Sequence, residues 1–246
     1  MKTKKIIVAG PLVLEAILPR GSAHDSPRIR AEKKKLSSEA QQRINRKYSY
    51  MKLELLIAAN FTPGDWIVTF TYDDAHAPSS REQAMARLKE FRRKLSALRR
   101  QDGLELRMIW NAENVFDLGR WHHHTIINSC GEDFALLREL WPWGTDIEIQ
   151  TLRIDKDHSF EALARYMCKE ARERPGLRSW SYTRSCRQPE VESFPVPDDT
   201  QLQPPKGATV YEDERHSNEY GSWRVVKYLA PDWRRVLRRP RRKRRR

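Results

Sequence analysis

Between residues 65 and 173 the apolar residues of this 246-residue chain change their period several times, and the order of these changes limits the possible folds. Segments that are β-branched, aromatic or alternating, as in strands, alternate with segments whose apolar residues recur at helical spacing. The predicted strands are residues 65–72, 104–113, 120–128 and 145–154, and the predicted helices are residues 79–103, 132–141 and 159–173. The order β-α-β-β-α-β-α is close to the split β-α-β arrangement. We therefore predict an α+β fold, a ferredoxin-like or RRM-like antiparallel sheet with helices on one face.

The flanking segments suggest how the rest of the chain is organised. The N-terminal "MKTKKIIVAGPLVLEAILPRGSA" imitates a secretory signal, but Pro11 and Glu15 interrupt its apolar stretch, so we expect a β-strand lying against the domain. The expected parts are an N-terminal strand with a basic arm, the main domain, an irregular proline-rich connection, and a C-terminal extension with a basic tail: residues 1–45, 46–190, 191–210 and 211–246.

The charge balance indicates the class of partner. Lysine and arginine number 47 against 33 acidic residues, a formal net charge of +14. This excess favours a polyanion, and we expect nucleic acid ahead of an acidic membrane surface. No segment approaches the roughly 20 apolar residues that cross a bilayer. The three cysteines form no CxxC pair, which indicates neither a zinc ribbon nor a disulfide framework and favours a reducing cytoplasm.

Three consecutive histidines occupy the third predicted strand. Because side chains alternate between the faces of a strand, His122 and His124 should point the same way and His123 the other way. Two imidazoles at this spacing can bind one divalent ion, although adjacent histidines are as often merely exposed polar residues. The preceding strand ends in Glu113, which antiparallel pairing across "NVFDLG" would bring close. Glu113, His122 and His124 are thus predicted to form a metal site with open positions for substrate oxygens and water.

The last predicted helix carries Tyr166 and Lys169 on one edge, beside its apolar stripe. In isolation such a pair is more often a tyrosine at the edge of the core with a lysine whose stem covers apolar surface. Next to a metal-bound phosphate, however, the tyrosine hydroxyl is a nucleophile for phosphodiester transfer, and the ammonium group favours its ionised form.

Taken together, these motifs resemble those of the HUH endonucleases that initiate rolling-circle replication, particularly the replication-associated proteins of phages, prophages and related elements. That family has a strand ending in alternating threonines, a histidine–hydrophobic–histidine motif, and a helix with a tyrosine and, three residues on, a lysine. The matching stretches are "VTFTY" with Thr69 and Thr71, "WHHHTII" with His122 and His124, and "ARYMCKE" with Tyr166 and Lys169. The resemblance spans about residues 37–189.

Two positions depart from or refine the family pattern. His123 stands where the family has a bulky apolar residue, so the ligand pair is assigned by strand alternation. Glu170 stands where a second tyrosine would be expected in the two-tyrosine class, so the chain resembles the single-tyrosine class.

The resemblance implies an enzyme that cuts one DNA strand at an origin and stays joined to its 5′ phosphate through Tyr166. Manganese or magnesium would be the metal, with zinc not excluded. Single-stranded origin DNA, a helicase and a DNA polymerase would be the partners, because the chain contains no G-x-x-x-x-G-K-[ST] motif of a motor. No membrane partner is expected, and the expected compartment is the cytoplasm of a bacterial host.

We expect the DNA strand to cross the sheet face, with phosphate contacts from the basic helix and aromatic stacking beside the site. For each arginine, a solvated helix face is an equally good interpretation. The predicted DNA-binding residues are Thr69, Thr71, Arg92, Arg93, Arg120 and Trp121, with Arg99 and Arg100 on the same helix.

Two alternatives remain open from the sequence. A single-tyrosine transposase or mobilisation relaxase would share the same residues. A non-catalytic nucleic-acid-binding module, with a structural metal or none, would share the charge.

Overall fold

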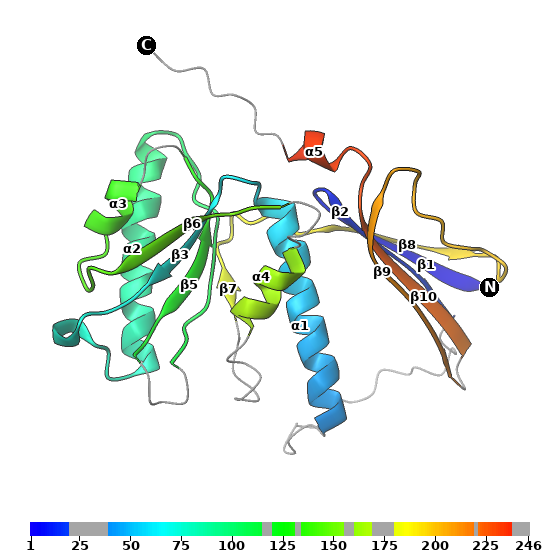
Figure 1. The fold of residues 1–246 in the computed structure, drawn as a ribbon, viewed down its shortest axis with the longest axis horizontal. Helices are drawn as coiled ribbons and strands as arrows, with labels where there is room; N and C mark the ends of the chain where they lie inside the picture. Colours follow the sequence, from blue (N-terminus) through cyan, green and yellow to red (C-terminus); the bar gives the residue numbers. More distant parts are fainter. Residues whose placement is uncertain are drawn as a thin grey trace, which may run out of the picture. The chain divides into compact units, whose positions relative to one another are not determined.

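The structure, a computed structural model, describes residues 1–19, 39–114, 120–130, 134–154, 160–168, 180–218 and 221–237. The chain divides into two compact units. One is Gln42–Arg187, and the other combines both ends of the chain, Met1–Gln41 and Gln188–Arg246. Each unit contains a five-stranded antiparallel sheet (Figure 1).

The sheet of Gln42–Arg187 has the strand order β6-β3-β5-β4-β7. Its strands are β3 (Trp66–Phe70), β4 (Met108–Trp110), β5 (His123–Ile127), β6 (Ile147–Thr151) and β7 (Ser181–Tyr182). Every pairing is antiparallel, and β4 and β5 are neighbours as predicted. Without β7, the order is that of the split β-α-β arrangement. The predicted α+β class is therefore confirmed.

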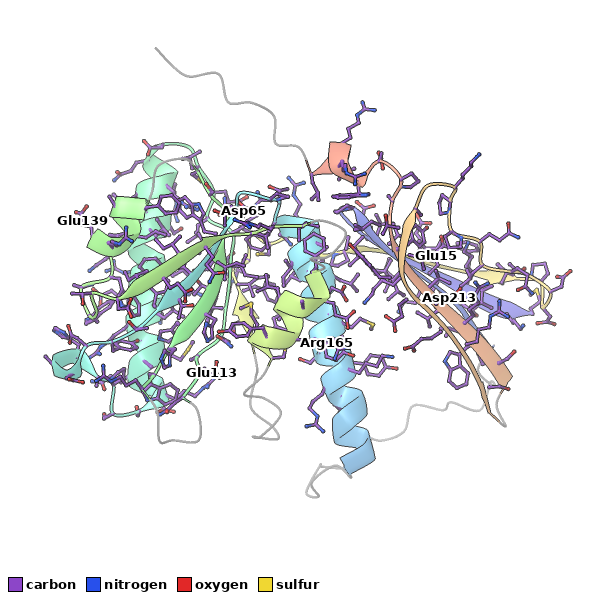
Figure 2. All side chains as sticks on the ribbon, in the orientation of Figure 1. Glu15, Asp65, Glu113, Glu139, Arg165 and Asp213 are labelled. Carbon is purple, nitrogen blue, oxygen red and sulfur yellow. The ribbon has the colours of Figure 1, made fainter. Side chains whose placement is uncertain are left out.

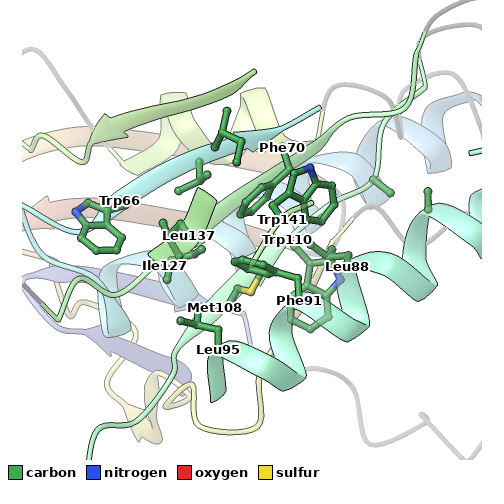
Figure 3. Close-up of a cluster of buried hydrophobic side chains, with 14 of the residues drawn as sticks. Trp66, Phe70, Leu88, Phe91, Leu95, Met108, Trp110, Ile127, Leu137 and Trp141 are labelled. Carbon is green, nitrogen blue, oxygen red and sulfur yellow. The ribbon is translucent and has the colours of Figure 1, made fainter. Parts of the chain in front are cut away.

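The two helices that connect these strands lie on one face of the sheet. α2 (Arg81–Gln101) follows β3, and α3 (Phe134–Glu139) follows β5. Both contribute to one buried cluster with the sheet, in which the Phe70 ring lies 4.6 Å from the rings of Phe91 and Trp141 (Figure 3). The expectation of helices on one face holds for this pair.

The opposite face carries a second helical layer, which the sequence does not predict. α4 (Phe160–Met167) lies there together with α1 (Glu39–Asn60), as Figure 1 shows. The Arg165 guanidinium on α4 donates to the Tyr50 hydroxyl on α1 at 3.1 Å and stacks on its ring. The sheet is thus buried on both faces, and this is why β5 is buried along its whole length.

Local sequence sets the ends of α2 as predicted. The Ser80 side chain accepts from the Gln83 backbone N–H at 3.2 Å, a serine N-cap. Beyond the last turn, Gly103 adopts a left-handed φ of 67°, which stops the helix. The predicted stripe is buried except for Leu98, which is exposed; the buried members are Ala84, Leu88, Phe91 and Leu95.

The other unit is built from both ends of the chain, in the order β8-β1-β2-β10-β9. Its strands are β1 (Lys2–Ala9), β2 (Leu12–Leu18), β8 (Glu190–Val196), β9 (Thr209–Asn218) and β10 (Gly221–Leu229), followed by the short α5 (Trp233–Val236). The N-terminal segment is therefore a hairpin inside its own sheet, not one strand against the main domain. The expectation of an irregular connection is wrong where β8 forms, because that strand is exposed at all but its last residue and shows no alternation.

Glu15, which interrupts the apolar N-terminal stretch, is buried within this sheet (Figure 2). Its carboxylate is 2.7 Å from the Lys4 ammonium and accepts from the Tyr228 hydroxyl at 2.6 Å. Two strands on either side thus satisfy the buried charge.

The remaining short element is a 3₁₀ turn, η1 (Asp74–His76). Among the described residues, none of the helices is both long and apolar enough to cross a membrane. Cys130, Cys168 and Cys186 are free thiols.

Candidate active site

Glu113 and His124 meet on the sheet face opposite α2 and α3. The His124 Nε2 atom lies 3.0 Å from a Glu113 carboxylate oxygen, and both residues are buried (Figure 2 labels Glu113). The backbones of Glu113 and His122 form an antiparallel bridge, with N–H···O distances of 2.9 and 2.8 Å. The pairing expected across the loop is confirmed, and it brings the carboxylate to the histidines.

His122 lies on the same face as His124. The two rings are parallel within 2°, with centroids 6.5 Å apart. Partial burial, and then the neighbouring His124, lower the pKa of His122. The neutral imidazole, the form that binds metals, is therefore favoured.

Thr69 supports the ring of His124 from the neighbouring strand. The two residues are directly paired between β3 and β5, and the Thr69 hydroxyl lies 3.2 Å from His124 Nδ1. Both nitrogens of His124 thus have a polar neighbour, which fixes the ring plane. Thr71, the second predicted threonine, instead donates to the carbonyl of Asp146, just before β6.

α4 presents Tyr166 to this cluster. Its buried residues Phe160, Ala164 and Met167 face the core, while Tyr166 is 48% exposed. The Tyr166 hydroxyl lies 3.4 Å from His124 Nε2 and 3.5 Å from Nδ1. A half-exposed phenol beside a buried histidine–carboxylate pair can meet a substrate from solvent.

Asn111 fixes α4 relative to β5, and sequence reasoning missed it. Its side-chain amide donates to the Met167 carbonyl at 2.8 Å, and its side-chain oxygen accepts from the His124 backbone N–H at 3.1 Å. A polar residue directly after the apolar "MIW" was the available signal.

The charges near Tyr166 favour its neutral form. Burial first, and then the carboxylates of Glu113 and Glu148, raise the pKa of Tyr166. Lys169, predicted to favour the ionised form, lies outside the described residues. A cation at this face would be needed to lower that pKa.

His123 points to the other face of the sheet, as strand alternation predicts. It is fully buried, its Nε2 lies 2.7 Å from the Tyr72 hydroxyl, and its Nδ1 faces the Asn111 carbonyl at 3.4 Å. Burial lowers the pKa of His123 to about 3. His123 is therefore a neutral, hydrogen-bonded core residue, which explains how it replaces a bulky apolar one.

The other predicted DNA-binding residues do not gather at this face. Trp121 is buried in the core cluster on the α2 side, so the expectation that it stacks on bases is wrong. Arg120 is exposed and paired with Asp74 at 2.5 Å. Arg92 and Arg93 belong to α2, which covers the other face, so the structure does not bring them together with Tyr166.

The donor set suits a divalent ion in its chemistry. A carboxylate and two imidazoles on one sheet face are the oxygen and nitrogen ligands that such ions take in open sites. In the described part of the chain, however, no three His, Cys, Asp or Glu side chains are already grouped as a metal site. Glu113 and His124 are hydrogen-bonded to each other, so metal binding would exchange that contact for two coordination bonds.

The fold and these residues define an α+β domain with a histidine–carboxylate–tyrosine cluster on one sheet face. Residues 65–171 match a family of replication-associated proteins, the ORF2 type. The matched range contains every candidate ligand and Tyr166. No curated protein and no solved structure matches the chain. The match supports a role in DNA replication and is consistent with a replication initiator.

Proposed function

We propose that this chain nicks and rejoins single-stranded DNA at a replication origin through a 5′-phosphotyrosine, and so initiates rolling-circle replication in the bacterial cytoplasm. The observation that carries the proposal is the position of the Tyr166 hydroxyl, 3.4 Å from the histidine that also contacts Glu113. The family match over the same residues points in the same direction.

In the proposed step, the Tyr166 oxygen attacks the scissile phosphorus in line with the 3′ oxygen. The new O–P bond replaces the bond to the 3′ oxygen, which leaves as a hydroxyl. The phenol loses one proton and the leaving oxygen gains one, so the step is balanced. Attack by a new 3′ hydroxyl reverses it and rejoins the strand, with no nucleotide cofactor.

Glu113, His122 and His124 would hold a divalent ion, manganese or magnesium with zinc not excluded. When bound, this ion would polarise the non-bridging phosphate oxygens and offset the carboxylate charge near Tyr166. Thr69 would orient the His124 ring, and Asn111 would keep α4 at its distance from β5. Because the chain has no phosphate-binding loop motif, a partner helicase would unwind the DNA and a polymerase would extend the 3′ end.

A covalent adduct tests the proposal. Full-length chain is incubated with Mn²⁺ and single-stranded DNA covering the origin of its own replicon, and a denaturing gel detects protein joined to DNA. The wild type should form the adduct, and Tyr166→Phe should form none while still binding DNA. Tyr48→Phe is the matched control, because Tyr48 is also about half exposed and lies on α1.

Two outcomes would contradict the proposal. Adduct formation by Tyr166→Phe would remove the assigned nucleophile. A wild type that binds the DNA but never becomes linked to it would indicate a non-catalytic binding module. Hairpin ends flanking the gene would favour transposition over replication for the same chemistry.

A further inference from the structure

A groove of about 910 Å³ lies along α2, on the sheet face opposite Tyr166. Its walls are α2, the segment after α2 and the segment that begins at the end of β7. Only one carboxylate, Glu105, lines it, whereas the cationic side chains that line it are Lys89, Arg92, Arg93, Arg100 and Arg184. The groove therefore has a strong positive charge.

The cations along α2 follow one edge of the helix. Lys89, Arg93 and Arg100 are separated by four and seven residues, so they stand above one another over about 16 Å of helix. Within the described ranges, none of these three nor Arg184 forms a salt bridge. By contrast, Lys94, outside the groove, is paired with Glu90 at 2.7 Å. The charge of the groove is thus left for a partner.

A smaller cavity of about 330 Å³ adjoins the groove and shares Lys89 and Arg92 with it. Trp110 lines this cavity and is 6% exposed, and its buried indole N–H has no hydrogen-bond partner among the described residues. The Arg92 guanidinium lies 4.7 Å from the Trp110 ring centroid. An unsatisfied buried donor is costly, so the N–H is available to an acceptor on a ligand.

We propose that this groove is a second binding site for single-stranded DNA, separate from the candidate active site. The backbone phosphates contact Lys89, Arg93, Arg100 and Arg184, and an unpaired base reaches the smaller cavity, where a carbonyl accepts from the Trp110 indole. An unpaired strand is favoured over a duplex because the base edges of a duplex are already paired. The inference rests on the proposed function only for the choice of DNA as the polyanion.

The first test measures binding without cleavage. Fluorescence anisotropy of a labelled 30-nucleotide oligothymidylate is recorded with the full chain in EDTA at several salt concentrations. The triple variant Lys89→Gln, Arg93→Gln, Arg100→Gln should bind at least about 10-fold more weakly. Its log K against log salt slope should fall by about 2, roughly 0.7 for each lost phosphate contact. Lys94→Gln should leave both affinity and slope unchanged, and equal behaviour of the two variants would overturn the proposal.

The second test concerns the base. Wild type should bind oligothymidylate more tightly than an abasic strand of the same length, and Trp110→Phe should remove most of this difference without changing the salt slope. Thermal unfolding of the conservative Phe variant checks that it folds, and the ¹⁹F signal of 5-fluorotryptophan at position 110 in the otherwise unchanged chain gives a second measurement. That signal should shift on adding oligothymidylate and not on adding the abasic strand. An unchanged signal, or a triple variant that loses duplex binding alone, would overturn the proposal.

These results are independent of the adduct assay. If the wild type forms adducts but the triple variant binds like Lys94→Gln, the groove inference fails and the proposed function stands. If the groove binds as described but no adduct forms, the proposed function fails and the groove inference stands.

Discussion

The phenol ring of Tyr166 lies edge-on to the imidazole of His124, with ring centroids 4.9 Å apart and planes inclined by 65°. Because β5 supplies the histidine and α4 the tyrosine, the distance between them depends on how α4 packs on the sheet. Asn111 touches both elements, which makes this packing specific.

Removal of either candidate ligand on β5 should remove adduct formation. We expect His122→Ala and His124→Ala each to lower the adduct yield in Mn²⁺ by roughly 100-fold or more, because the metal site is left incomplete. EDTA should have the same effect on the wild type, and added Mn²⁺ should restore it. His76→Ala is the control, since His76 is an exposed histidine paired with Asp73. Full activity of His124→Ala would contradict the assignment.

Thr69→Val should weaken the metal site without removing it. The change deletes the hydroxyl beside His124 Nδ1 while keeping the side chain's shape. We expect the Mn²⁺ concentration for half-maximal adduct formation to rise about 10-fold to 100-fold, with a near-normal rate at saturating Mn²⁺. Thr71→Val should leave that concentration unchanged, because its hydroxyl contacts the Asp146 carbonyl. Equal shifts for the two variants would argue against a positioning role for Thr69.

His123→Ala should reduce stability more than catalysis. The sequence alone suggests that alanine at this position leaves cleavage largely intact, but the buried imidazole bonded to Tyr72 makes the folded protein the limiting factor. Loss of the ring and its hydrogen bonds should lower the free energy of unfolding by about 2–4 kcal/mol in urea titrations. In His123→Leu, the added change Tyr72→Phe should restore part of the loss, because both polar partners are then gone. No gain from the second change would contradict this account.

Tyr228 should make the terminal unit sensitive to high pH. Burial first, and then the hydrogen bond to Glu15, raise the pKa of Tyr228 above its ordinary value. The hydroxyl therefore stays protonated in the folded state after the unfolded chain has begun to ionise, so its contribution is complete below about pH 10 and is lost as the pH rises further. Lys4, which also contacts Glu15, is present in both forms compared. Urea unfolding between pH 9 and pH 11 should fall less steeply for Tyr228→Phe, and identical slopes would contradict the prediction.

Local patterns predicted the elements that carry the candidate site. The Ser80 cap and the apolar stripe of α2 are properties of consecutive residues, and the alternation in β5 separates His123 from His124 on steric grounds alone. The antiparallel bridge at Glu113 followed from the short loop between two strand signals. These features need only short-range information.

Features that depend on contacts between distant residues were not predictable in this way. β1 pairs with β8 across about 190 residues, and nothing in the polar, exposed sequence of β8 indicates its partner. Trp121 reads as a surface aromatic beside the histidines, whereas tertiary packing buries it. The role of Asn111 depends on α4, which lies more than 50 residues further along the chain.

β5 places a core residue and a candidate ligand at consecutive positions, and this arrangement joins two properties that are usually separable. A slip of β5 by one residue against β3 would turn His124 into the aromatic core and His123 toward Glu113, exchanging every neighbour of both rings. A misregistered chain would therefore lose its packing and its catalytic centre in the same event. Insertions or deletions of one residue within β5 should be far more damaging than substitutions, and enzymatic activity in a preparation would count the correctly registered molecules.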